Sequence, residues 1–230
     1  MHGLARDPAD GTLYVGTHEG LFSYATAEPE LVSPVMDFMG FAVAGPGEFV
    51  ASGHPGPDVE LAEPMGLIRS VDAGRTWAEV SRGGESDFHS LTASPSAVIG
   101  YDGALRRTQD GTTWDEATLP EPIADVALSP DGQVALITTE SGLQRSPDQG
   151  DTWEVVTDAP LMVYADWADP DTVVGLSVDG RIMVSTDGAS TFEARGEAPA
   201  ADVVAFSASL EGEQLEALLA TQDEVIVIPL

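Results

Sequence analysis

A short segment occurs four times in the chain at a nearly constant interval, and this repeat constrains the fold more than any other feature. The four segments read SVDAGRTW at 70–77, TQDGTTW at 108–114, SPDQGDTW at 146–153 and STDGASTF at 185–192. Their shared aspartates are at 72, 110, 148 and 187, so the period is 38, 38 and 39 residues. A period near 40 with short apolar runs and polar turns is typical of a β-propeller blade with four antiparallel strands.

The residue types of the segment suit a tight hairpin between two strands. The Asp carboxylate can accept backbone N–H groups across the turn. Gly supplies the positive φ that the turn needs, and the Trp or Phe that follows can fill the space between blades. The sequence therefore predicts a structural role, remote from any ligand, for Asp72, Asp110, Asp148 and Asp187.

The same register extends in both directions and gives six units, near 2–33, 34–84, 85–120, 121–160, 161–199 and 200–230. Each unit contains a first, second, third and fourth strand, and the repeated segment joins the third to the fourth. The last unit ends after its third strand, so its fourth is absent or comes from residues upstream of Met1. We therefore expect an all-β, six-bladed β-propeller that forms one domain over 1–230.

The pattern S/T-x-D-x-G-x-T-W resembles the Asp-box, or BNR repeat. This motif occurs in bacterial sialidases and other glycosidases, in sortilin-like receptors and in photosystem assembly propellers. The HGL start, the DFMGF and DFHSL strands and the SGHP loop also resemble exported bacterial propellers described as glycosyl-hydrolase-like. The resemblance implies a fold more than an activity, because these relatives share an architecture and differ in function.

Charge and composition exclude several classes of partner. The chain has 39 acidic residues against 9 basic ones, all Arg, and a formal net charge of −30. Nucleic acid and anionic membranes would be repelled, so neither is expected as a partner. No Cys is present, which excludes disulfides and thiolate metal sites. No apolar run reaches the roughly 20 residues of a membrane span. The first residues do not read as a signal peptide, and export is favoured only if such a segment has been removed.

The four histidines are concentrated in the first three units. In a propeller, the start of the first strand and the end of the second lie on one face, opposite the repeated hairpin. His2, Met39 and His89 are at equivalent positions near the start of the first strand. The ends of the second strands contribute His18 and His54, and in the third unit Tyr101 and Asp102. Asp37 and Asp87 precede Met39 and His89 by two residues, so the residues of this face are His2, His18, Asp37, Met39, His54, Asp87, His89, Tyr101 and Asp102.

A ligand on this face is the function that these residues favour. Imidazole with Met and carboxylate, in the absence of Cys, suits copper or another borderline transition metal, with His2, Met39 and His89 as metal ligands. A small polar molecule is the other expected ligand, with His18, His54, Tyr101 and Asp102 as binding residues. The plainest alternative is that all of them are ordinary strand-end residues, hydrogen-bonded to loops.

Two further functions stay open on the sequence. Asp37 and Asp87 could act as the carboxylate pair of a glycoside hydrolase, with an aromatic side chain stacking on the sugar. Sialidase activity is not expected, because the resemblance would require an arginine triad and no Arg is at the start of a first strand or the end of a second one. A face this acidic would also repel an anionic sugar. The third function is a protein-interaction scaffold, which predicts a large apolar surface patch.

Overall fold

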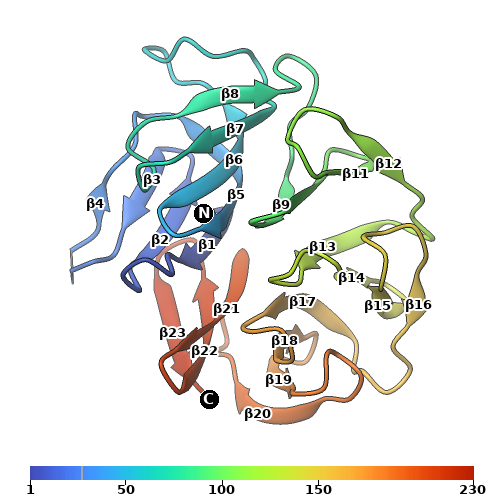
Figure 1. Cartoon of the computed structure of the whole chain (residues 1–230). Helices are drawn as coiled ribbons and strands as arrows, with labels where there is room; N and C mark the ends of the chain where they lie inside the picture. The colour runs from blue at the N-terminus through green and yellow to red at the C-terminus, as the bar shows by residue number, and fades with distance from the viewer. Residues whose placement is uncertain (27) are drawn as a thin grey trace. The chain divides into compact units, whose positions relative to one another are not determined.

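The computed structural model describes residues 1–26 and 28–230 and contains only strands, turns and loops in these residues. In these residues, twenty-three strands form six separate antiparallel sheets, and each sheet uses consecutive strands in chain order (Figure 1). Five sheets have four strands and the last has three. The predicted fold class, an all-β, six-bladed β-propeller, is confirmed. No helix of the described residues is long and apolar enough to span a membrane.

Contacts divide the described residues into two compact units, 1–116 and 117–230. That the whole chain forms one domain stays a prediction. The first unit contains three sheets: β1 Gly3–Arg6, β2 Leu13–Thr17, β3 Gly20–Ser23 and β4 Glu30–Leu31; β5 Asp37–Gly45, β6 Glu48–His54, β7 Leu67–Ser70 and β8 Ala78–Ser81; β9 Ser90–Ser94, β10 Ala97–Tyr101, β11 Leu105–Thr108 and β12 Asp115–Ala117.

The second unit contains the other three sheets, which repeat the same up-and-down order. Their strands are β13 Ile123–Leu128, β14 Ala135–Thr139, β15 Gly142–Ser146 and β16 Glu154–Val155; β17 Met162–Trp167, β18 Val173–Ser177, β19 Arg181–Ser185 and β20 Glu193–Glu197; β21 Ala205–Glu211, β22 Gln214–Ala220 and β23 Val225–Pro229.

The second strands of the sheets are buried, and the fourth strands are largely exposed. In β2 and β14 nearly every residue is buried, whereas both residues of β4 and of β16 are exposed. Strands that are covered on both faces read as continuous apolar runs, and strands with one covered face alternate. In the first unit the aromatic side chains of Tyr14, Phe38, Phe41 and Phe49 form one core cluster.

The first strands bring the sheets of the first unit together, because β5 contacts both β1 and β9. Within the second sheet Asp37 is paired with His54, so the start of β5 lies beside the end of β6. Phe49, near the start of β6, is paired with Ser70 at the end of β7. The repeated hairpin that follows Ser70 therefore lies at the other end of β6 from His54.

The four repeated hairpins share one hydrogen-bond pattern. Asp72 Oδ1 accepts the Ser70 hydroxyl at 2.8 Å and the Thr76 N–H at 2.9 Å, and its Oδ2 accepts the Thr76 hydroxyl at 2.7 Å. Asp110, Asp148 and Asp187 accept the equivalent Ser or Thr groups. Burial acts to raise the pKa of Asp72, but these hydrogen bonds lower it to about 2. This bonding supports the structural role that the repeat predicts.

Candidate functional site

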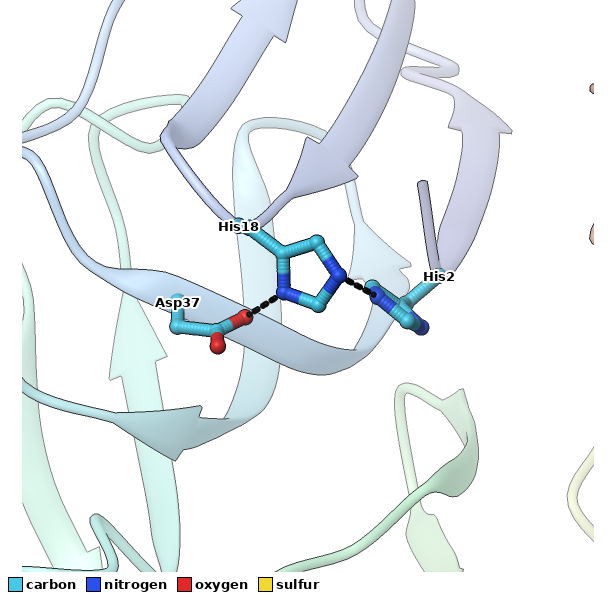
Figure 2. Close-up of side chains that lie close together, drawn as sticks. All are labelled: His2, His18 and Asp37. Atoms are coloured by element: carbon cyan, nitrogen blue, oxygen red, sulfur yellow. Dashed lines mark hydrogen bonds and ion pairs between the residues drawn. The ribbon is translucent and has the colours of Figure 1, made fainter. Parts of the chain in front are cut away.

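His18 is the centre of a three-residue group in the first unit. Figure 2 shows its imidazole between the carboxylate of Asp37 and the ring of His2. The distance from His18 Nδ1 to Asp37 Oδ1 is 2.8 Å, and the distance from His18 Nε2 to His2 Nε2 is also 2.8 Å. One ligand atom from each of the three residues lies within 4.8 Å of the others. In the described part of the chain, this is the one group of His and carboxylate side chains with that spacing.

Three different segments position this group. His2 precedes β1, and its N–H donates to the Gly16 carbonyl at 3.0 Å, which joins it to the end of β2. His18 follows β2 in a turn that is held by the Thr17 hydroxyl, a donor to the Gly20 carbonyl. Asp37 begins β5 between two buried side chains, Met36 and Phe38. The two sheets therefore fix the backbone on both sides of the group.

The hydrogen bonds define where the protons of the His18 ring lie. A carboxylate only accepts, so His18 donates its Nδ1–H to Asp37, and its Nε2 carries the lone pair that faces His2. A carboxylate that holds the outer ring N–H of a histidine is the usual second partner of a metal-ligating imidazole. Burial lowers the pKa of His2, and the neighbouring N-terminal amine and His18 lower it further, which favours the neutral imidazole that a metal ion needs.

A second group, one sheet further along, contains the other two histidines. His54 Nδ1 lies 2.6 Å from Glu63 Oε1, and its Nε2 lies 3.3 Å from Asp87 Oδ2. His89 Nε2 lies 3.5 Å from the same Asp87 oxygen. The pKa of His54 is raised by the hydrogen bond to Glu63 and by the charges of Asp87 and Asp37, although burial acts in the opposite direction. The two groups are neighbours, since Asp37 and His54 are paired across β5 and β6.

A buried residue holds Asp87 and His89 in place. Phe88, between them, is fully buried, and its N–H donates to the buried Ser52 hydroxyl on β6 at 2.9 Å. The His89 N–H donates to the Tyr101 carbonyl at 3.1 Å. Asp87 Oδ1 is buried and, among the described residues, no hydrogen-bond donor reaches it. An unpaired buried carboxylate oxygen is costly, so it marks a position where a cation or a donor is expected.

The remaining predicted residues have different surroundings. Asp102 accepts the Ser86 hydroxyl at 2.6 Å and the Arg106 guanidinium at 3.0 Å, and Arg82 lies 3.8 Å away. Burial acts to raise the pKa of Asp102, but these hydrogen bonds lower it. The Asp102 side chain is thus occupied by protein groups. Met39 on β5 and Tyr101 at the end of β10 are half-buried.

The sequence did not point to three of these side chains. Glu63 lies in the Pro-rich insertion after β6, whose only signal was an acidic loop beside a histidine. Arg82 lies in the loop between β8 and β9, and Arg106 lies near the start of β11; their side chains reach Asp102, which follows β10. Strand register gives the backbone position of an arginine, and the guanidinium can lie several ångströms from it.

No protein-family model matches the chain. No curated protein sequence matches it either. Several solved structures, in contrast, are similar to this chain. A gluconolactonase from Xanthomonas campestris, XC5397, is 13% identical with a TM-score of 0.73 over 99% of this chain and 85% of that one. YCF48 bound to a D1 peptide is 15% identical with a TM-score of 0.61 over 98% and 91%.

A GH74 enzyme from Niastella koreensis is 11% identical with a TM-score of 0.62 over 98% of this chain and 51% of that enzyme. This chain therefore spans about half the length of the GH74 enzyme. At identities this low, the likenesses support the β-propeller fold alone, because one fold carries many functions.

Proposed function

We propose that this chain binds a divalent transition-metal ion through His2 and His18, with Asp37 orienting His18. The observation that carries the proposal is the convergence of two imidazole nitrogens and one carboxylate oxygen within 4.8 Å from three separate segments. Imidazole and carboxylate groups without thiolate suit Zn²⁺, Cu²⁺ and Ni²⁺. The ion takes the place of the proton that the two Nε2 atoms share, and the Asp37 carboxylate holds the remaining Nδ1–H of His18.

The overall charge supports this class of ligand. A net charge of −30 attracts cations to the surface and repels anionic ligands. His18 is exposed over 61% of its side chain, so an ion can reach it from solvent. Met39, which the sequence also suggested as a ligand, is not needed by this proposal.

Glycoside hydrolysis by Asp37 and Asp87 is the second candidate, and the GH74 likeness is its external support. Hydrolysis requires one of the two carboxyls to be protonated before the reaction. Asp37 has His18 at 2.8 Å, and Asp87 has His54 at 3.3 Å and His89 at 3.5 Å. Both carboxylates thus lie against imidazole nitrogens, which are themselves metal ligands, so this arrangement favours metal binding over hydrolysis.

A protein-interaction scaffold is the third candidate. The structure of YCF48 was solved with a bound D1 peptide, and this binding is a property of YCF48. Among the described residues, the most exposed large apolar side chains are Val35, Val71, Val155 and Val178, and they belong to different sheets or turns. Single exposed apolar residues of this kind are normal on any surface.

Equilibrium dialysis against Zn²⁺ or Cu²⁺ at pH 7.5, followed by elemental analysis, tests the metal proposal. The wild-type chain is expected to retain the ion, and His18→Gln is expected to lose one equivalent or to weaken its binding at least 10-fold. Glu213→Gln is the matched control, because Glu213 lies exposed in the β21–β22 turn and its loss removes one charge elsewhere. Circular dichroism checks that each variant is folded. The proposal fails if wild type retains neither ion, or if His18→Gln retains as much as wild type.

A further inference from the structure

In the second histidine group, the Nε2 atoms of two imidazoles face one carboxylate oxygen. His54 Nδ1 faces the Glu63 carboxylate at 2.6 Å, and His89 Nδ1 faces the Asp87 backbone carbonyl at 3.2 Å. Both partners only accept, so each imidazole donates its Nδ1–H. In a neutral imidazole the lone pair is then on Nε2. Both Nε2 atoms face Asp87 Oδ2, which itself has only lone pairs to offer.

When both imidazoles are neutral, a metal ion can bind the three lone pairs that face one another. Nε2 of His54 lies 3.3 Å from Asp87 Oδ2, and Nε2 of His89 lies 3.5 Å from it. Two ligand atoms of a tetrahedral zinc ion are separated by about 3.3 Å when each bond is about 2.0 Å. These two distances to Asp87 Oδ2 are therefore close to those between ligands of one ion. The other oxygen, Asp87 Oδ1, is buried without a donor among the described residues.

The second group also repeats a contact of the first. In each case a histidine at the end of the second strand of one sheet meets an aspartate at the start of the next sheet. The two pairs are His18 with Asp37 and His54 with Asp87. In each case the other ring nitrogen of that histidine has a second partner, which is His2 for His18 and Glu63 for His54. The repeat in the sequence thus produces two related sites in neighbouring sheets.

We propose that His54, Asp87 and His89 form a second binding site for a divalent transition-metal ion. Glu63 is its positioning residue, because it holds the Nδ1–H of His54 and so directs the Nε2 lone pair inward. The ligand atoms of this group are not all within 4.8 Å of one another. The ion therefore binds first to His54 and Asp87, and His89, with 60% of its side chain exposed, rotates to complete the site. The class of ligand rests on the proposed function, whereas the residues do not overlap with those of the first site.

Titration of the full chain with Zn²⁺ at pH 7.5, in competition with a chromophoric chelator, measures both sites. Wild type is expected to bind two equivalents, with the second group weaker because it must rearrange. His89→Gln and His18→Gln are each expected to bind one equivalent, and the double variant none. Glu63→Gln is expected to weaken the second equivalent about 10-fold to 100-fold and leave the first unchanged. Glu60→Gln is the matched control, since Glu60 is exposed in the same loop.

Titration with Co²⁺ gives a readout that a purely structural role of these residues would not change. The visible absorbance of bound Co²⁺ should fall in His89→Gln by the contribution of one site, and it should be unchanged in Glu60→Gln. If His89→Gln does not fold, Glu63→Gln decides, because it leaves all three ligands in place.

Three results would overturn the second site. Wild type could bind a single Zn²⁺ that only His18→Gln removes, in which case the first site stands alone. It could bind one or two ions that neither His89→Gln nor Glu63→Gln affects. Finally, nitrogen NMR could show His54 protonated on both ring nitrogens in the presence of Zn²⁺, so that a proton is the cation beside Asp87. If no variant and not even wild type binds Zn²⁺, the first site fails as well.

Discussion

Gly53 determines how closely β6 approaches β5 where the two histidine groups meet. It has a φ of 140°, and a Cβ atom at this position would lie 2.0 Å from the Asp37 carbonyl oxygen and 2.8 Å from the Met39 nitrogen. Only glycine can take this backbone conformation without strain at such a distance. The residue next to His54 therefore makes the pairing of Asp37 with His54 possible.

Replacing Gly53 with Ala should separate these two strands. We expect Gly53→Ala to lower the free energy of unfolding by about 2 kcal/mol or more, because the strained φ and the clash add. Gly47→Ala is the control: Gly47 has a φ of 67°, but a Cβ atom there would have no other atom within 4 Å, so the strained φ alone should cost about 1 kcal/mol. Urea unfolding measures both. Equal losses in the two variants would show that close packing at Gly53 is unimportant.

At the level of the element, the repeated hairpin explains how a departure from the pattern is tolerated. Ala73 and Gly74 both have positive φ in the first copy, and Gly188 and Ala189 do so in the fourth. The turn thus has two successive left-handed positions, and glycine can occupy either one. This accounts for the glycine that is one residue early in the fourth copy.

The carboxylate of this hairpin gives the fold a sensitivity to acid. The pKa of Asp72 is lowered to about 2 in the folded chain, from an ordinary value of 3.8. Its contribution to stability is therefore complete above about pH 4 and is lost as the pH falls through about 2. Asp72→Asn should have a lower melting temperature than wild type at pH 7, and this difference should shrink between pH 4 and pH 2. Glu213→Gln should show no such trend, and a constant difference for Asp72→Asn would contradict the assignment.

Elements and hairpins could be predicted from the sequence because they depend on local spacing. The four copies fixed the strand order and placed each Asp in its turn, and strand direction brought His2, His18, Asp37, His54, Asp87 and His89 to one region of the first unit. Which side chains meet could not be predicted. The register of β5 shifts between Phe38 and Gly40, so the position of Met39 relative to Asp37 does not follow from simple alternation.

Loop residues were beyond prediction for a different reason. Glu63 reaches His54 only through the path of residues 55–66, which no periodicity determines. Asp102 is among the predicted ligands because of its strand position, but its side chain is paired with Arg106 across the β10–β11 turn and lies near Arg82 of the loop before β9. Long side chains and loops therefore set the chemistry of this region, on a backbone that the repeat specifies.

For the whole molecule, the excess of carboxylates lowers the stability of the folded state through charge repulsion. With 39 acidic and 9 basic residues, negative charges far outnumber positive ones, and like charges repel more strongly when the chain is compact. Salt screens this repulsion, since the Debye length falls from roughly 10 Å at 0.1 M to about 3 Å at 1 M.

We therefore expect the melting temperature at pH 7 to rise by several degrees between 0.05 M and 1 M NaCl. The same comparison at pH 4.5 should give a smaller rise, because part of the carboxylates is then protonated and the repulsion is weaker. Differential scanning calorimetry without added metal measures both, which separates screening from ion binding at the histidine groups. A melting temperature that is independent of salt at pH 7, or that rises as much at pH 4.5, would show that charge repulsion does not limit the stability of this fold.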